Sequence, residues 1–220
     1  MIGHFLREMP KRWLDVAGGS LLLLLFSPVL VATAVAIRLD TPGPVLFRQT
    51  RLGRWGRPFL IYKFRTMLQD SEHLGTGLET SRTDFRITAV GAVLRNFRID
   101  ELPQLLNVVR GEMSLVGPRP LLPEFLPWYS DLDRRRLEAP PGMTGWQQVN
   151  GAARNTWRER VALDVWYVDH RSLWLDLNIL LRTAGVVLRA DSSYAEDGSQ
   201  QSGVPDAYAA MTGGEPHGPR

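Results

Sequence analysis

Residues 95–107 read RNFRIDELPQLLN, and this stretch places two adjacent carboxylates, Asp100 and Glu101, just before a run rich in leucine. The run at 102–110 has the apolar spacing of a short helix, and Gly111 follows where a helix C-cap glycine is expected. The two acids are therefore predicted to lie at a helix start. Free N–H groups and the positive end of the helix dipole favour ionised carboxylates there.

Two interpretations of this acid pair compete. Acidic residues are common in first helical turns and Asp is a preferred N-cap, so simple capping explains the pair. An ionised and oriented carboxylate can also bind a metal ion or attack phosphorus. Arg95 and Arg98 lie within about a turn and would favour the ionised form. Other parts of the sequence have to decide between the two interpretations.

Arg119 stands between Pro118 and Pro120. Pro118 has a fixed φ angle, and Pro120 disfavours the helical conformation at the residue before it, so the sequence predicts a stiff, extended chain at Arg119. A guanidinium presented from such a chain suits bidentate binding of phosphate. A proline-rich turn with a solvated arginine is the simpler alternative.

The composition suits one domain that meets phosphates or membranes. The chain has 220 residues, enough for a sizeable core, and no cysteine, which excludes disulfides and thiolate chemistry. Its four histidines lack the spacing of zinc ligands. Without residues 190–220 the chain holds 25 basic and 18 acidic residues, a net charge of +7. All but two of its basic residues are arginines, which suits phosphate-bearing or membrane partners, although codon bias produces the same ratio.

The N-terminal region contains an apolar run at 16–37, 22 residues without a charge. As a straight helix it would measure about 33 Å, enough to cross a bilayer core. Ser27 and Pro28 interrupt its middle, where proline kinks a helix. Basic residues flank both ends, which favours keeping both on the cytoplasmic side. A bent, re-entrant helix satisfies both features, and a single-pass anchor with a tolerated proline stays open.

The region 41–67 is predicted to form a β-hairpin that turns at 51–58. Lys63 and Arg65 flank an aromatic residue at its end. These two cations either contact phosphate or are simply solvated side chains at the end of the strand.

The rest of the chain is predicted to be mainly helical, which gives an α/β fold. Helices are expected at 87–97 and 157–167, and a surface loop at 68–84. The segment 121–137 fits an amphipathic helix at a membrane interface or on a core. The segment 173–189 is too interrupted by charges to span a membrane and would lie on one or pack as core. The composition from 190 onward is typical of a disordered tail.

Several motifs in one order resemble the bacterial sugar transferases, small monotopic polyprenyl-phosphate phosphoglycosyl transferases. The resemblance covers about 11–189. It rests on Lys11-Arg12 ahead of Asp15, Ser27-Pro28, YKFRTM at 62–67, DELPQ with Asn107, MSLVGPRP at 113–120 and PGMTGW at 141–146. This family resemblance implies a re-entrant membrane helix at 1–40, a cytoplasmic catalytic domain at 41–189 and a tail at 190–220. It places the protein on the cytoplasmic face of the bacterial inner membrane, in contact with membrane lipid.

The resemblance also implies a reaction: transfer of a sugar-1-phosphate from a nucleotide diphosphate sugar, usually a UDP-sugar, to a polyprenyl phosphate such as undecaprenyl phosphate. This would be the first membrane step of glycoconjugate or exopolysaccharide assembly. Asp100 would be the nucleophile and, with Mg²⁺, the metal ligand. Glu101 would be its acidic partner, which could either deprotonate or orient the lipid acceptor. Lys63, Arg95 and Arg119 would bind phosphate, with Arg65 as a further contact. UMP would leave as a covalent phosphosugar-aspartate forms.

One position departs from the family pattern. The family commonly places an arginine directly after the Asn-Gly pair, but here Ala152 and Ala153 intervene before Arg154. Arg154 is carried as the contact to the nucleotide sugar on the hypothesis that it reaches the same place from a shifted loop.

Two rival functions remain at this stage. A membrane-attached, Mg²⁺-dependent hydrolase of nucleotide diphosphate sugars would use the same acids to activate water. An anchored adaptor would use the arginines to hold anionic lipid or nucleic acid. The cations cluster around acids and no Walker-type loop or nucleic-acid motif is found, so no nucleic-acid partner is expected. The sequence leaves open which sugar is transferred, the polyprenol length and the oligomeric state.

Overall fold

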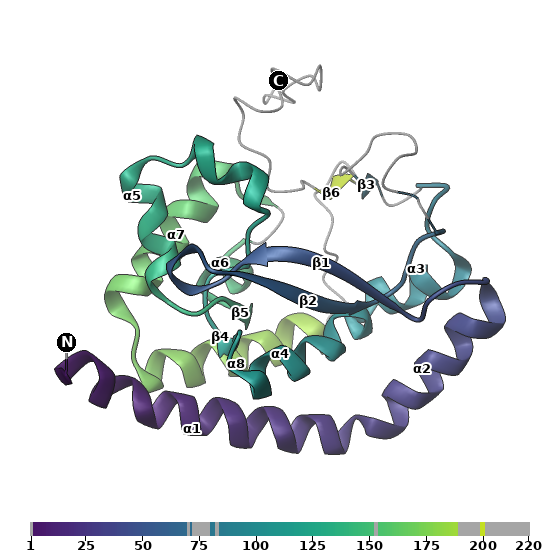
Figure 1. Ribbon diagram of the computed structural model, residues 1–220, viewed down its shortest axis with the longest axis horizontal. Coiled ribbons are helices and arrows are strands. Elements are labelled where there is room, and N and C mark those ends of the chain that lie inside the picture. Colours follow the sequence, from purple (N-terminus) through teal and green to yellow (C-terminus); the bar gives the residue numbers. More distant parts are fainter. Residues whose placement is uncertain are drawn as a thin grey trace.

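The computed structural model describes residues 2–69, 71, 80–81, 84–151, 154–188 and 199–200. Its fold is a mixed one, as predicted: a long bent pair of N-terminal helices lies beneath a β-hairpin and a set of short helices (Figure 1). The strands described form three two-stranded sheets. The predicted loop at 68–84 and the tail at 190–220 lie mostly outside these residues. From them the structure describes β3 (Thr80–Ser81) paired with β6 (Ser199–Gln200).

The N-terminal apolar run is broken where the sequence predicts. Helix α1 (Ile2–Leu25) ends just before α2 (Ser27–Asp40), and the segments Met9–Leu25 and Ser27–Asp40 are bent by 59°. Pro28 has no N–H to donate to the Leu24 carbonyl, and the Ser27 hydroxyl donates to that carbonyl instead (2.7 Å). Within the described residues no single helix is long and apolar enough to cross a membrane. The bent pair together passes that test by length and composition.

Helices α1 and α2 carry a continuous series of exposed, large apolar side chains. Leu24, beside the break, is 73% exposed, and Leu39 near the end of α2 is 83% exposed. Exposed apolar surface of this extent marks an interaction site in a soluble protein or a membrane contact. The series comprises Trp13, Leu14, Leu21, Leu24, Leu25, Val29, Val31, Val35 and Leu39.

The opposite face of α1 is attached to the rest of the molecule by polar side chains. Lys11 donates to Asp176 (2.5 Å) and to the Val116 carbonyl (3.0 Å). Arg12 donates to two carbonyls at the C-terminal end of α4 (Leu105–Arg110), and the Asp15 carboxylate accepts from a backbone N–H beyond that helix. Lys11 and Arg12 were interpreted as basic flanks of a membrane segment. In the folded protein they also fix α1 to α4 and to α8 (Leu173–Leu188).

The predicted hairpin is confirmed. Strands β1 (Leu46–Leu52) and β2 (Pro58–Phe64) pair antiparallel, joined by the 3₁₀ turn η1 (Arg54–Gly56). Along β2, Phe64 packs with Ile37 of α2 and Leu94, whereas Ile61 packs with Val108 and Met113. The hairpin is therefore held between the N-terminal helices and the region that carries the acid pair.

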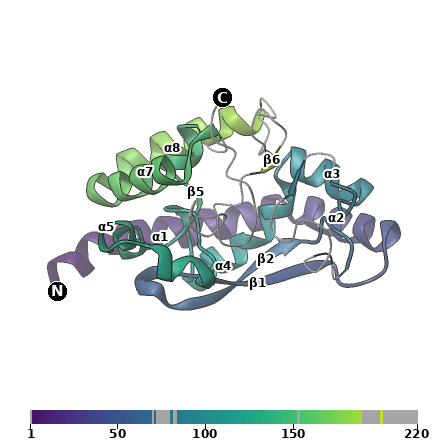
Figure 2. The same ribbon diagram turned by 90° about the horizontal axis from the view of Figure 1, so that it is seen from above.

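The helix predicted at 157–167 is confirmed, and the segment predicted at 173–189 to lie on a membrane or pack as core forms a second helix. Helix α7 (Trp157–His170) begins with a capping box between Thr156 and Glu159, and α8 follows it after a short turn. Figure 2 shows α7 and α8 on one side of α1 and the hairpin on the other. Tyr167 near the end of α7 and Ile179 in the middle of α8 pack on Val116 of β4 (Ser114–Val116).

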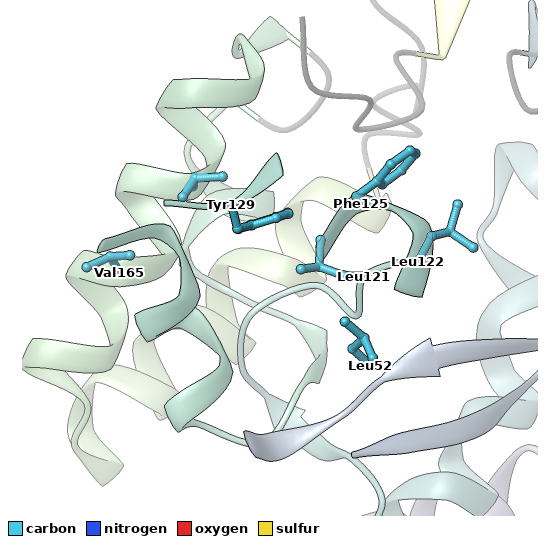
Figure 3. Packing of buried hydrophobic residues seen from close by; sticks show 7 residues of the cluster. Leu52, Leu121, Leu122, Phe125, Tyr129 and Val165 are labelled. Atoms are coloured by element: carbon cyan, nitrogen blue, oxygen red, sulfur yellow. The ribbon is translucent and has the colours of Figure 1, made fainter. Parts of the chain in front are cut away.

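The predicted helix at 121–137 is wrong. The structure has three short pieces instead: η4 (Pro123–Trp128), α5 (Asp131–Arg134) and η5 (Arg135–Glu138). Pro123 and Pro127 prevent a continuous helix. Phe125 and Tyr129 turn inward and join a buried cluster with Leu52 of the hairpin and Val165 of α7 (Figure 3). This segment is part of the core and not an amphipathic interfacial helix.

Candidate active site

The acid pair lies on a 3₁₀ helix, η3 (Ile99–Gln104), that runs directly into α4. The sequence predicted the pair at the N-terminus of an α-helix, but that helix begins only at Leu105. Arg98, before η3, has a positive φ of 55°, which is uncommon for a residue with a side chain. This left-handed residue turns the chain between α3 (Ala89–Asn96) and η3. Gly111 ends α4 with a φ of 90°, as predicted.

Glu101 forms ion pairs with two cations that lie far apart in the sequence. Lys63, near the end of β2, donates to Glu101 Oε1 at 3.0 Å, and Arg119, from the loop after β4, donates to the same oxygen at 3.2 Å. Burial disfavours ionisation of Glu101, but Lys63, Arg119 and Arg98 outweigh it and hold the pKa of this carboxyl well below its usual range. Glu101 is therefore ionised at every physiological pH.

Asp100 behaves in the opposite way. Burial and the neighbouring negative charge of Glu101 raise the pKa of Asp100 to about 6, against the pull of Lys63, Arg95 and Arg119. The expectation that the site favours the ionised form is thus right for Glu101 and wrong for Asp100. At neutral pH Asp100 is still mostly ionised, but its carboxylate is more basic than an ordinary aspartate. Adjacent acids with such different proton affinities are a common property of reactive sites.

Arg95 is the third predicted cation near the pair. It lies in the last turn of α3, its Nε donates to the Thr66 hydroxyl at 2.9 Å, and its charge lowers the pKa of Asp100. The structure therefore brings Lys63, Arg95 and Arg119 together around Asp100 and Glu101.

Arg65 and Arg154 have other surroundings. The Arg65 guanidinium is buried at 6% exposure and donates to the carbonyls of Thr41 and Pro42 and to the Thr41 hydroxyl. It thereby ties the end of α2 to the hairpin, and its predicted contact with phosphate remains a prediction. Arg154 is exposed, on the turn between Gly151 and α7, where its backbone N–H donates to the Gly151 carbonyl (2.9 Å).

A buried ion pair, which the sequence did not reveal, holds the backbone of Arg119 in place. Arg136, 4% exposed, donates to the Arg119 carbonyl (3.0 Å), to the Tyr129 hydroxyl (2.8 Å) and to Asp164 of α7. Burial raises the pKa of Asp164 to about 6 even though Arg136 opposes this, so Asp164 is ionised at neutral pH. One signal could have revealed the pair: Asp164 lies between Val161 and Val165 on the face of α7 that meets the core.

Close backbone packing also fixes the loop that carries Arg119. A Cβ atom placed on Gly117 would lie 2.3 Å from the Pro140 carbonyl oxygen, and one on Gly145 would lie 2.2 Å from the Gly117 oxygen. Larger residues cannot fit at these points without moving β5 (Gly142–Thr144), which pairs in parallel with β4. The Arg119 loop is therefore clamped between β5, Arg136 and its own prolines.

Comparison with known proteins decides the family. The family model described as bacterial sugar transferase matches residues 6–190. The chain is 46% identical over 178 residues to an uncharacterized sugar transferase, EpsL, of Bacillus subtilis (strain 168), covering 81% of this chain and 87% of that protein. The chain belongs to the bacterial sugar transferase family.

Two further relatives of this sugar transferase have named activities. A UDP-glucose:undecaprenyl-phosphate glucose-1-phosphate transferase of Caulobacter vibrioides is 46% identical over 197 residues, covering 85% of this chain and 73% of that protein. The transferase of the same name in Escherichia coli (strain K12) is 41% identical over 182 residues, covering 79% of this chain and 39% of that protein. This chain is accordingly a transferase enzyme.

The acid pair of this sugar transferase suits a magnesium ion that is shared with a substrate. Mg²⁺ is usually bound by one or two carboxylates together with substrate phosphates. Lys63 and Arg119 already occupy Glu101, whereas no hydrogen bond or ion pair among the described residues engages the Asp100 carboxylate. The described part of the chain has no cluster of three or more potential ligands that could hold a metal ion alone. Among the described residues Asp100 would therefore be the ligand of such an ion, and phosphate oxygens of the donor would supply further ligands.

Proposed function

We propose that this sugar transferase moves a sugar-1-phosphate from a UDP-sugar to undecaprenyl phosphate, releases UMP, and does so through a covalent phosphosugar on Asp100. The observation that carries the proposal is the pairing of a basic Asp100, whose carboxylate no described residue hydrogen-bonds, with a permanently ionised Glu101 that holds two cations. The named activities of the relatives in Caulobacter vibrioides and Escherichia coli support the donor and acceptor classes.

The chemistry follows from the charges of these residues. An Asp100 oxygen attacks the sugar-bearing phosphorus, the bond from that phosphorus to the UMP oxygen breaks, and UMP leaves with the electron pair. A phosphate oxygen of the lipid then attacks the same phosphorus and displaces Asp100. Mg²⁺ bound at Asp100 would supply neutralising charge for the diphosphate. Lys63, Arg95 and Arg119 face the same place and would stabilise negative charge on the donor.

Glu101 takes a different role from Asp100. A general base needs a pKa near the working pH, and the pKa of Glu101 lies far below it. The sequence left open whether Glu101 deprotonates or orients the lipid phosphate. The low pKa of Glu101 argues against deprotonation of the lipid phosphate. Glu101 instead keeps Lys63 and Arg119 pointed at the place where phosphate binds, and would orient the lipid phosphate through these two cations.

Product analysis tests this proposal against the hydrolase alternative. The protein is incubated with Mg²⁺ and UDP-sugars labelled in the sugar, with and without undecaprenyl phosphate. Transfer predicts lipid-linked sugar diphosphate and many UMP per enzyme with the lipid, but at most one UMP per enzyme without it, because the adduct cannot turn over. Repeated UMP release in the absence of lipid would identify a hydrolase.

We also propose that the bent α1–α2 pair enters one leaflet of the bacterial inner membrane from the cytoplasmic face and leaves on the same side. The exposed apolar series along both helices requires an apolar partner, and lipid acyl chains provide one. Polar contacts of Lys11, Arg12 and Asp15 keep the start of the pair against the catalytic domain. A sugar nucleotide from water and a lipid phosphate can then meet at Asp100.

Substitution Pro28→Ala should convert part of the population to a membrane-crossing helix. Alanine restores the N–H that Pro28 lacks, so the helix can continue past the break. The chain has no cysteine, so single reporters at His4→Cys and Arg57→Cys can be labelled with a membrane-impermeant maleimide. With Pro28 present, both reporters should react only from the cytoplasmic side. With Pro28→Ala, the residue 4 reporter should react from the other side in a fraction of molecules. Opposite-side labelling with Pro28 intact would contradict the re-entrant arrangement.

A further inference from the structure

Asn107 is completely buried in α4 and makes three side-chain hydrogen bonds. Its Oδ1 accepts from the Tyr62 backbone N–H (3.2 Å), and its Nδ2 donates to the Leu60 carbonyl (2.7 Å) and to Glu112 Oε2 (2.7 Å). Its own carbonyl accepts from the N–H groups of Glu112 and Met113. A polar side chain with no exposure, with both amide hydrogens donated and the amide oxygen accepting, is compatible with few arrangements of its neighbours.

The two bonds to β2 have the geometry of strand pairing. Leu60 and Tyr62 are alternate residues, so their backbone groups point to the same edge of β2, while β1 pairs along the other edge. The Asn107 amide donates to one residue and accepts from the residue two further on, as a residue of a parallel neighbouring strand does. One side chain therefore attaches the free edge of β2 to α4.

This attachment joins the two elements that form the acid–cation pair. Lys63 directly follows Tyr62 on β2, and η3 with Glu101 continues into α4 without a break. The Lys63–Glu101 contact of 3.0 Å spans the same two elements. We propose that Asn107 is a positioning residue that fixes Lys63 against Glu101 and thereby sets the cation geometry of the phosphate site. Its effect on catalysis rests on the proposed function, whereas the attachment itself does not.

The residue type is specific to this task. Aspartate would keep the acceptor for Tyr62 but lose the donor to Leu60, and would place a second carboxylate beside Glu112. Leucine would leave the Leu60 carbonyl and the Tyr62 N–H without partners in a buried place. Only an amide of this length supplies both groups.

Amide hydrogen exchange tests the attachment without any reference to activity. In Asn107→Ala, the Tyr62 amide should lose protection, while the Ile61 and Lys63 amides, which face β1, keep theirs. If Asn107→Ala does not fold, Asn107→Leu is the second variant, since leucine keeps the volume of the side chain but offers the Tyr62 N–H no acceptor. Unchanged protection at Tyr62 in whichever variant folds would overturn the proposal.

A double-mutant cycle tests the positioning role. Asn107→Ala should lower the transfer rate about 100-fold, since a displacement of about 1 Å can have this effect, mostly in kcat. In a Lys63→Met background the same change should cost less than about threefold, because the residue it positions is gone. Arg110→Ala is the control: it removes an exposed contact between the same elements, Arg110 to the Tyr62 hydroxyl, and should stay within about twofold.

The outcomes separate this inference from the proposed function. Equal losses from Asn107→Ala with and without Lys63 would show a general structural role and overturn the positioning proposal. Failure of the unchanged enzyme to make any lipid-linked product would refute the proposed function, while the exchange experiment would still decide the attachment of β2 to α4.

Discussion

Substitution Asp100→Asn should abolish transfer, with a loss on the order of 10⁴-fold or more, and no phosphosugar adduct should form. Asparagine has the shape of aspartate but no nucleophilic oxygen anion and no charge for a metal ion. The measurement is lipid-linked product from labelled donor, together with intact-protein mass spectrometry for the adduct. An Asp100→Asn enzyme that transfers sugar phosphate would remove Asp100 as the nucleophile.

The same variant should fold at least as well as the original. Folding raises the pKa of Asp100 from 3.8 to about 6, so at neutral pH the ionised carboxylate is less favourable in the folded state than in the unfolded chain. Removing the charge removes this penalty, and the unfolding temperature should stay equal or rise. A stable but inactive variant would show that Asp100 serves the reaction at a cost in stability.

Glu101→Gln is the matched control for that experiment. Glutamine removes the charge that attracts Lys63 and Arg119 but leaves Asp100 in place. We expect transfer to fall about 100-fold while the adduct on Asp100 still forms when the lipid is withheld. Loss of the adduct in both variants would assign the two acids one shared function.

The sequence predicted the parts of this fold that depend on local chemistry. The proline break after α1 and the glycine that ends α4 each follow from one residue type with a strong backbone preference, and the hairpin at 41–67 follows from two β-prone runs around a turn. The failure at 121–137 has a physical cause. Its charged and aromatic residues suited an amphipathic helix, but Pro123 and Pro127 prevented a continuous one, and Phe125 filled the core.

The sequence could predict which residues form the candidate site but not the protonation behaviour of its acid pair. Lys63, Arg95 and Arg119 were chosen from their motifs, and the structure places all three around the acid pair. The raised pKa of Asp100 could not be predicted, because it depends on burial by residues that are distant in the sequence. The sequence also singled out Arg65 for phosphate, although the carbonyls at the end of α2 occupy its guanidinium.

Replacing Arg136 by methionine should destabilise the fold strongly, because it removes one half of a buried ion pair. Asp164, 1% exposed, would lose its partner and would either bury an unpaired charge or take up a proton, and losing one half of a buried ion pair typically costs about 3–5 kcal/mol. Chemical denaturation of the purified protein measures this loss. Asp164→Asn should cost less, since its amide can still accept a hydrogen bond from Arg136. A loss below about 1 kcal/mol for Arg136→Met would contradict the importance of the pair.

The double variant Arg136→Met with Asp164→Leu separates stability from catalysis. Replacing both halves of a buried pair by apolar residues is often neutral, so most of the lost stability should return. Transfer should be slower than in the original protein both in Arg136→Met and in the double variant, because in each the Arg119 carbonyl lacks the hydrogen bond from Arg136 that fixes its loop. Recovery of both properties would mean that Gly117, Gly145 and the two prolines hold Arg119 in place without Arg136. Recovery of stability alone would make Arg136 the link between the core around α7 and the cation that meets Glu101.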